Sequence, residues 1–419
     1  MRAHLPLSLL LVALLLPGCP RKTPAPDPSG DAHARVEPAT VAKVADVAHG
    51  KELVLTYQCN RCHDGSGHEA AVQAKHCVHC HKDIMEDRFS AAPASLAKWK
   101  PRVKELADAP SLEAAGRRFT RPWVEQYLLQ PSDLRPHLLQ YMPRLAITAD
   151  DARDIAAYLV PVERPISDPM KTLELAGADL GKGRQLLETK GCGSCHVFTG
   201  VAALPSSNPP AMSPKDFEVG HKLAPDLRVM RARVTPAKLV AWLQNPAGVK
   251  ADTKMPKIEL SDADVKNVAG YLFGAELAEP ARPARRERLP LLARKVLFKE
   301  VDEKVFHRTC WHCHSEPDYA IGDGGPGNSG GFGFKPRGLN LSAYEGIAAG
   351  FLDDKNERQS VFAKDKEGVP RLVRALLARS EEERGAPTGE VRGMPLGYDP
   401  LSPEEIQLVD TWVAQGRPR

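Results

Sequence analysis

The chain lacks several features by which common classes of protein are recognised. Beyond one short apolar stretch, Leu5 to Leu16, no segment resembles a membrane-spanning helix, so the body of the chain is expected to be soluble. A formal net charge of only +4 over 419 residues argues against a nucleic-acid partner. The glycine-rich stretch from Gly322 to Gly333 lacks the GK[ST] ending of a phosphate-binding loop. Cysteine, too, is scarce outside one recurring motif.

Eight of the nine cysteines belong to four copies of the motif CxxCH, and the ninth is Cys19. The motif is the attachment site of a c-type haem, in which two thiols bond the porphyrin vinyl groups and the adjacent histidine binds the iron. A structural zinc site would not place a histidine directly after every second cysteine. The sequence therefore predicts four covalently attached haem c groups. The attachment cysteines are Cys59, Cys62, Cys77, Cys80, Cys192, Cys195, Cys310 and Cys313, and the proximal iron ligands are His63, His81, His196 and His314.

Cys19 has no cysteine left with which to form a disulfide. It follows Leu16-Pro17-Gly18, which resembles the lipobox of bacterial lipoprotein signals, behind Arg2 and the short apolar stretch. We therefore predict a signal peptide over residues 1–18 and acylation of Cys19. Two or more acyl chains at one terminus give stable anchoring to a lipid membrane. The alternative is an ordinary secretory signal that contains a stray cysteine.

Residues 19–45 are rich in proline, which disfavours helix and sheet. We interpret this stretch as a semi-extended tether between the lipid and the body of the chain. Together with the lipobox it predicts a lipid-anchored protein on the periplasmic or cell-surface side of a bacterial membrane.

Internal repetition divides the rest of the chain into three segments. We place them at residues 46–164 with two motifs, 175–278 with one and 296–419 with one, and a basic linker at 279–295 joins the last two. Gly50 and Gly183 each stand nine positions before the first cysteine of a motif, in a short amphipathic stretch expected to be helical. The opening helix of the third segment, around Lys299 to Thr309, is recognisable by its position alone.

All three segments end in the same way. A Met-Pro pair precedes an amphipathic helix that carries an aromatic residue 16, 16 and 18 positions after the methionine. Each closing helix begins with a hydroxyl residue followed by acidic residues, which is typical of a helix N-terminus. The methionines are Met142, Met255 and Met394, the caps are Thr148, Ser261 and Ser402, and the aromatic residues are Tyr158, Tyr271 and Trp412. Each segment is thus expected to pair an opening helix with a closing helix.

With these motifs the segments resemble class I cytochrome c domains in tandem, and the third is closer to the planctomycete-type cytochrome c domains. The resemblance implies a mostly α fold with long loops, in which the opening and closing helices cross and enclose a haem. It implies Met142, Met255 and Met394 as distal iron ligands. It also implies that the carbonyls of Pro225 and Pro110 accept the N–H of a proximal imidazole and so orient the ring.

The second motif of the first segment departs from the family pattern, because one methionine cannot serve two irons. Met142 is assigned to the His63 haem, although its spacing also allows the His81 haem. The other haem then needs a different distal ligand or has an open site. His68 is slightly favoured as that ligand and His76 is the alternative, since both lie between the two motifs. His49 and His137 are interpreted as surface or capping residues, and His79 and His312, in the variable slots of their motifs, as local surface groups.

Iron ligated by histidine and methionine has no vacant position for a substrate, which suits one-electron transfer. We therefore expect a membrane-tethered tetrahaem cytochrome that carries electrons between redox proteins, a respiratory donor and an acceptor. The alternatives are an enzyme related to the di-haem cytochrome c peroxidases, with the His81 haem as an open active site, and a cytochrome subunit of a larger oxidoreductase. The basic linker is either a solvated connection or a docking patch for an acidic partner.

Overall fold

The computed structural model describes residues 44–419 apart from 104–106, 132–133, 139–141, 162–167, 208, 282, 316–329 and 387–390. The predicted signal peptide, Cys19 and nearly all of the predicted tether lie outside the described residues. Ala45–Arg419 form one unit by their contacts. No helix in the described part of the chain is both long and apolar enough to cross a membrane.

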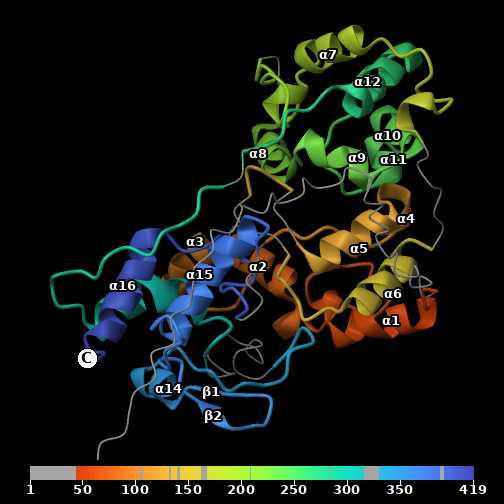
Figure 1. Ribbon diagram of the computed structural model, residues 1–419. Helices are drawn as coiled ribbons and strands as arrows, with labels where there is room; N and C mark the ends of the chain where they lie inside the picture. Colours follow the sequence, from red (N-terminus) through yellow and green to blue (C-terminus); the bar gives the residue numbers. More distant parts are fainter. Residues whose placement is uncertain are drawn as a thin grey trace, which may run out of the picture. The chain divides into compact units, whose positions relative to one another are not determined.

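The described residues are mostly helical, as predicted (Figure 1). The first segment contains α1 Val47–Thr56, η1 Cys59–Arg61, η2 Gln73–Lys75, α2 Cys77–Met85, α3 Pro93–Val103, α4 Ala115–Arg118, α5 Arg121–Leu129 and α6 Ala149–Leu159. The second contains η4 Pro169–Lys171, α7 Leu180–Thr189, η5 Cys192–Ser194, α8 Pro214–Leu223, η6 Leu227–Val229, α9 Met230–Arg233, α10 Pro236–Gln244, α11 Pro246–Val249 and α12 Asp262–Gly274.

The third segment is also helical but carries a small sheet. It contains α13 Phe298–Val301, the π-helix η7 Asp302–Cys310, α14 Tyr344–Ala349, β1 Phe351–Leu352, β2 Arg358–Gln359, α15 Arg371–Glu383 and α16 Pro403–Ala414. The two strands are antiparallel, with Phe351 opposite Gln359. The opening helix expected around Lys299 to Thr309 is thus present, as a turn of α-helix continued by a π-helix that ends at Cys310.

The opening and closing helices pack together in each segment, as the repeats predict: α1 on α6, α7 on α12, and α13 and η7 on α16. Gly50 and Gly183, each nine positions before a motif, lie where α1 meets α6 and where α7 meets α12. A Cβ on Gly50 would lie 2.0 Å from the Asp154 carbonyl oxygen, and one on Gly183 would lie 2.1 Å from that of Asn267. Glycine therefore stands at both positions because the neighbouring backbone leaves no space for a side chain.

The closing helices begin where the sequence predicts. Thr148, Ser261 and Ser402 each accept the backbone N–H of the third helical residue, and the carboxylate at that residue accepts the N–H of the cap. These reciprocal bonds satisfy backbone donors that would otherwise be unpaired at the helix N-terminus. The capped start fixes where each closing helix begins relative to its Met-Pro loop.

Three clusters of buried apolar side chains coincide with the three segments. One is centred on Val54 and Ile155, the second on Leu187 and Val268, and the third on Trp412, whose side chain is fully buried. Each cluster also packs against the first cysteine of a motif and against the methionine of a Met-Pro pair; these pairs are Cys59 and Met142, Cys192 and Met255, and Cys310 and Met394.

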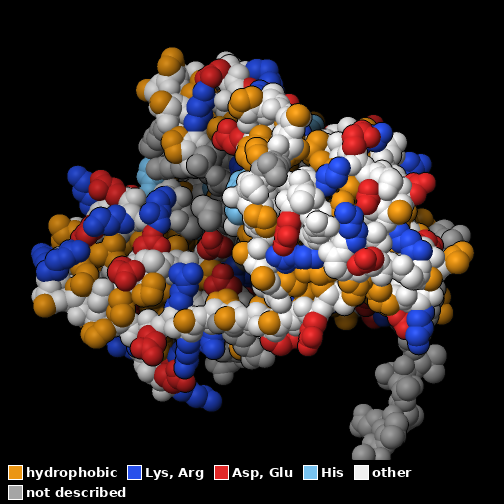
Figure 2. Space-filling model, turned by 90° about the horizontal axis from the view of Figure 1, so that it is seen from above, with side chains coloured by type: hydrophobic (Ala, Val, Ile, Leu, Met, Phe, Trp, Pro, Cys, Tyr) orange, Lys and Arg blue, Asp and Glu red, His pale blue; other side chains and the backbone are white. Residues whose placement is uncertain are grey.

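The linker at 279–295 is not a free connection, because its arginines bind the third segment. Arg288 forms a bidentate ion pair with the buried Asp410 of α16, at 2.6 and 3.0 Å. Arg285 pairs with Glu381 and Arg294 with Glu300. Three arginines of the linker are therefore engaged within the chain. Side chains of both signs are also interspersed on the face seen in Figure 2, without a broad patch of one sign.

Candidate haem-binding site

A cavity of about 640 Å³ brings together three of the four motifs. His63, His81 and His314 all line it, and so do Met142 and Met394. His63 follows η1, His81 lies on α2 and His314 follows η7, while the two methionines lie in loops of the first and third segments. The fourth motif does not border this cavity: Cys192 and Met255 pack instead on the apolar core of the second segment.

Two of the predicted proximal histidines have the orientation that the resemblance implies. Nδ1 of His63 lies 2.7 Å from the Pro110 carbonyl oxygen, and Nδ1 of His196 lies 2.8 Å from that of Pro225. Because a carbonyl only accepts, each Nδ1–H donates, which leaves Nε2 with a lone pair for a metal ion. Burial lowers the pKa of both rings and favours the neutral form that a metal ligand requires. The predicted carbonyl contacts are confirmed.

The ring of His314 is held in a different way. Burial lowers its pKa to about 4, while the Leu339 carbonyl acts in the opposite direction. Nδ1 of His314 is nevertheless without a hydrogen bond of ordinary geometry among the described residues. The backbone of His314 is fixed instead, since its carbonyl accepts the N–H of Leu341 at 2.6 Å.

None of the eight motif cysteines forms a disulfide, and burial raises the pKa of several of their thiols. It raises the pKa of Cys59, Cys192 and Cys313 to about 11 and that of Cys310 to about 12. Of the eight, Cys62, Cys77, Cys310 and Cys313 line the cavity.

The two methionine loops on the cavity are joined through Arg144, which follows the Met142-Pro143 pair. Its backbone N–H donates to the Leu396 carbonyl and its Nη2 to the Pro395 carbonyl, each at 3.2 Å. Nε of Arg144 lies 2.7 Å from the Glu382 carboxylate, and both side chains are mostly buried. These contacts fix the first segment against the third at the side of the cavity that holds both sulfur atoms.

Met255 has a partner that the sequence did not reveal. Nε1 of Trp242, on α10, donates to its Sδ at 2.8 Å. A thioether is a weak acceptor, so this bond serves to orient the sulfur more than to stabilise the fold. No spacing in the sequence predicts this contact between Trp242 and Met255.

Positive charge predominates in the lining of the cavity, which includes six arginines, three aspartates, no lysine and no glutamate. Arg233 is the clearest case: its Nε is buried without a hydrogen-bond partner among the described residues. Burial lowers its pKa to about 10, and nearby Arg135 and Arg118 act in the same direction. Its guanidinium lies over the rings of Phe119 and Trp123, 4.8 and 5.2 Å from their centroids. A lining in which positive charge predominates suits a group with an acidic edge, such as a haem with its two propionates.

The candidate ligands for the second haem are placed apart from one another. His68 is half-buried, its Nε2 lies 2.8 Å from the Lys51 carbonyl, and it does not line the cavity. The ring of His312, in contrast, lies with its centroid 6.0 Å from that of His81, and both line the cavity. His312 is exposed, as expected for a surface group, and its ring borders the cavity.

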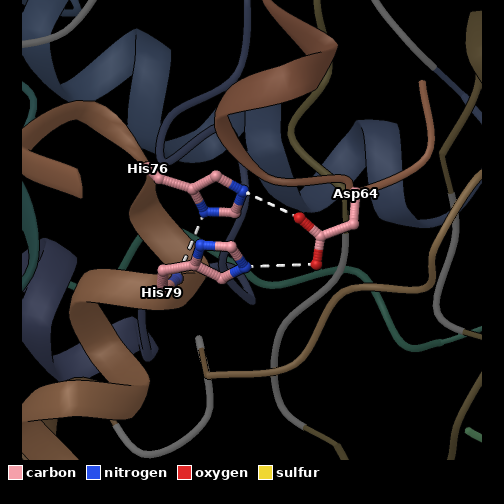
Figure 3. A group of neighbouring side chains, drawn as sticks. All are labelled: Asp64, His76 and His79. Carbon is pink, nitrogen blue, oxygen red and sulfur yellow. Dashed lines mark hydrogen bonds and ion pairs between the residues drawn. The ribbon is translucent and has the colours of Figure 1, made fainter. Parts of the chain in front are cut away.

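His76 is fully buried but does not line the cavity either. Its Nδ1 accepts the backbone N–H of His79 and so caps α2. Its ring stacks on that of His79 with centroids 3.6 Å apart, and Asp64 faces both Nε2 atoms, at 3.4 and 3.1 Å (Figure 3). Burial raises the pKa of Asp64, but the bonds and charges of His79 and His76 outweigh this and lower it overall.

The Asp64, His76 and His79 cluster links the residue after the first motif to the start of α2, which bears the second. Its donor atoms lie within 4.8 Å of one another, and two imidazoles with a carboxylate are a donor set that divalent ions accept. The arrangement fixes the distance between the two motifs of the first segment. His79 is thereby confirmed as a local group.

His49 and His137 are placed as predicted, away from the cavity. Nδ1 of His49 lies 2.9 Å from the Asp154 carboxylate at the crossing of α1 and α6. The ring of His137 stacks on that of His221, with centroids 3.9 Å apart, where the first and second segments meet.

Trp242, Arg233 and His312 are the candidate site residues that the sequence did not reveal, since each acts across a distance that no local pattern encodes. Searches of protein-family models, of curated proteins and of solved structures found no match to this chain.

Proposed function

We propose that the chain is a tetrahaem c-type cytochrome that passes single electrons between redox proteins and is held at a bacterial membrane through acylated Cys19. The observation that carries this proposal is the gathering of His63, His81 and His314 with Met142 and Met394 on one cavity. Motifs far apart in the sequence would not converge by local folding alone. Their convergence suits cofactors that exchange electrons directly.

A bound haem would supply an iron that alternates between the ferric and ferrous states. In this proposal the thiols of the four motifs hold the haems, and the adjacent histidines bind the irons from one side. Met142, Met255 and Met394 bind three irons from the other side. The Pro110 and Pro225 carbonyls fix two of the histidine rings, and Trp242 fixes the sulfur of Met255.

The assignment of Met142 to the His63 haem is supported by packing. Met142 and Cys59 lie against the same apolar cluster of the first segment. The presence of His312 beside His81 removes the need for Met142 at the second haem. It also disfavours the peroxidase alternative, which requires an exchangeable position at that iron.

The proposal is tested on the full chain produced with the haem-attachment machinery. We expect an intact mass that corresponds to four covalent haems, a low-spin ferrous spectrum and no rapid binding of carbon monoxide. A chain that carries zinc, or no haem, would refute the proposal outright. Rapid carbon monoxide binding together with peroxide turnover would instead support the enzyme alternative.

The membrane part of the proposal needs a separate measurement. Cys19→Ser should release the protein from the membrane fraction without changing its haem content, because Cys19 lies outside the motifs. A variant chain that remains in the membrane fraction would contradict anchoring by acylation.

A further inference from the structure

The second motif is the one whose iron lacks an obvious distal ligand. Its histidine, His81, is carried on α2 and faces the cavity. The three Met-Pro pairs are matched to the other three motifs by the apolar clusters on which they pack. A distal ligand for this iron would therefore come from another residue on the cavity.

The ring of His312 is placed where such a ligand would be. Two imidazoles bound on opposite sides of one metal ion, with metal–nitrogen distances of about 2 Å, have ring centroids roughly 6 Å apart. The centroids of His81 and His312 are 6.0 Å apart, and their planes are inclined at 54°. Parallel stacked rings lie closer, as His76 and His79 do with centroids 3.6 Å apart. The separation of His81 and His312 matches the one expected for two imidazoles on a single metal ion.

The two middle residues of the third motif point in different directions. Trp311 turns into the third segment, where its ring stacks on His307 with centroids 3.4 Å apart and its Nε1 donates to the Leu341 carbonyl. His312 turns to the cavity. The anchored tryptophan fixes the backbone of the motif and thereby the direction in which His312 leaves it.

The first and third segments are fastened together on this side of the cavity as well. Gln58, just before the first motif, accepts both the backbone N–H of Phe332 at 3.4 Å and Nη1 of Arg61 at 3.1 Å. The guanidinium of Arg61 lies over the ring of Phe332, 5.4 Å from its centroid. A residue of the third segment can therefore hold a fixed position toward α2.

We propose that His312 is the distal iron ligand of the haem attached at Cys77 and Cys80, opposite His81. The inference rests on the proposed function, since it requires that this haem be present. The third motif then serves two cofactors: Cys310, Cys313 and His314 hold one haem, and His312 binds the iron of the next. The second haem is a bis-histidine haem with a lower reduction potential than the methionine-ligated ones.

The test compares His312→Ala with the unaltered full chain after loading with haem. We expect four haems by intact mass in both. In the variant one haem loses its low-spin ferric signal in electron paramagnetic resonance, and the ferrous protein binds about one carbon monoxide per chain, because one iron is left five-coordinate. Added imidazole should restore the low-spin signal.

A matched control separates this ligand from the other histidines. His68→Ala removes a half-buried imidazole that does not line the cavity. It should leave the spectrum and carbon monoxide binding unchanged. A His312→Ala chain with four low-spin haems, or a His68→Ala chain with an open iron, would overturn the inference.

A second variant covers the case in which His312→Ala does not accumulate. His312→Met keeps a ligating side chain, and it should add a near-infrared methionine band and raise the potential of one haem. A titration and spectrum identical to those of the unaltered chain would overturn the inference. If the unaltered chain itself lacks four haems, the proposed function fails and not the ligand assignment alone.

Discussion

The first and second segments repeat the same helix crossing but build different surroundings on it. In both, the backbone N–H of the residue that caps the opening helix donates to a side chain of the closing helix. Asp46 donates to Asp154 at 3.0 Å, and Asp179 donates to Asn267 at 2.9 Å. In both, a glycine of the opening helix lies against the carbonyl of that same residue. The repeated part is thus the backbone contact.

The two segments differ in the charge at the helix crossing and in how the methionine is enclosed. The first crossing has an ionisable pair, His49 and Asp154, where the second has the neutral Asn267. The methionine of the second segment lies against its own core and receives a bond from Trp242, whereas Met142 opens on a cavity shared with the third segment. One scaffold can therefore support a methionine packed within its own segment or one that opens on a cavity shared with a neighbouring segment.

The backbone contact that the two segments share is tested most strongly at the glycines where the helices cross. Gly50→Ala and Gly183→Ala should each lower the free energy of unfolding of the haem-loaded chain by about 3 kcal/mol, because the new Cβ would meet backbone atoms. The measurement is guanidinium unfolding followed by circular dichroism.

Gly181→Ala is the matched control, since it makes the same change on α7. A Cβ there would meet only the Asp179 carboxylate at 3.4 Å, so stability should stay level or rise by up to about 1 kcal/mol. If Gly183→Ala were as stable as Gly181→Ala, the close crossing of α7 and α12 would be wrong.

The charge of the shared cavity is tested at Arg233. Arg233→Met should lower the reduction potential of the nearest haem by on the order of 1 kcal/mol, roughly 40 mV, because a positive charge nearby disfavours the ferric iron. Spectroelectrochemical titration measures the change. Arg117→Met, an exposed arginine of α4, is the control and should shift no potential. Equal shifts in the two variants would indicate a general charge effect and not a site in the cavity.

The smallest expected effect is the pH dependence of stability where α1 crosses α6. The hydrogen bond to Asp154 raises the pKa of His49 above its ordinary 6.5. Burial raises the pKa of Asp154, but the bond from His49 outweighs this and lowers it below 3.8, with the charge of Arg153 adding to the effect. The histidine contributes stability below pH 6.5 that is lost as the pH rises through its folded pKa. The carboxylate contributes stability above pH 3.8 that is lost on acidification.

The crossing of α1 and α6 should therefore be most stable between pH 3.8 and pH 6.5. Protection factors from amide hydrogen exchange in α1 should fall between pH 6 and pH 8, whereas those in α7 should not follow them. His49→Gln should abolish the difference. The same decline in α7 would contradict the assignment to His49, because Asn267 does not titrate.

Much of the scaffold could be predicted from local patterns. Thr148, Ser261 and Ser402 cap the closing helices because a hydroxyl followed by acidic residues satisfies helix N-termini wherever it occurs. The carbonyl contacts of His63 and His196 were implied by the resemblance to class I cytochrome c domains. The role of His312 could not be predicted in this way, because the residue that it faces lies more than two hundred positions away.

By itself the sequence determined the four CxxCH motifs, the three helix pairs and the glycines at two of the crossings, since each depends on neighbours in the chain or on a strict repeat. The tertiary structure decided which motifs share a cavity, which arginine is left there without an acid, and which imidazole faces His81. These depend on how Arg144 and Gln58 fasten the first segment to the third. Contacts of that kind join residues that carry no common pattern.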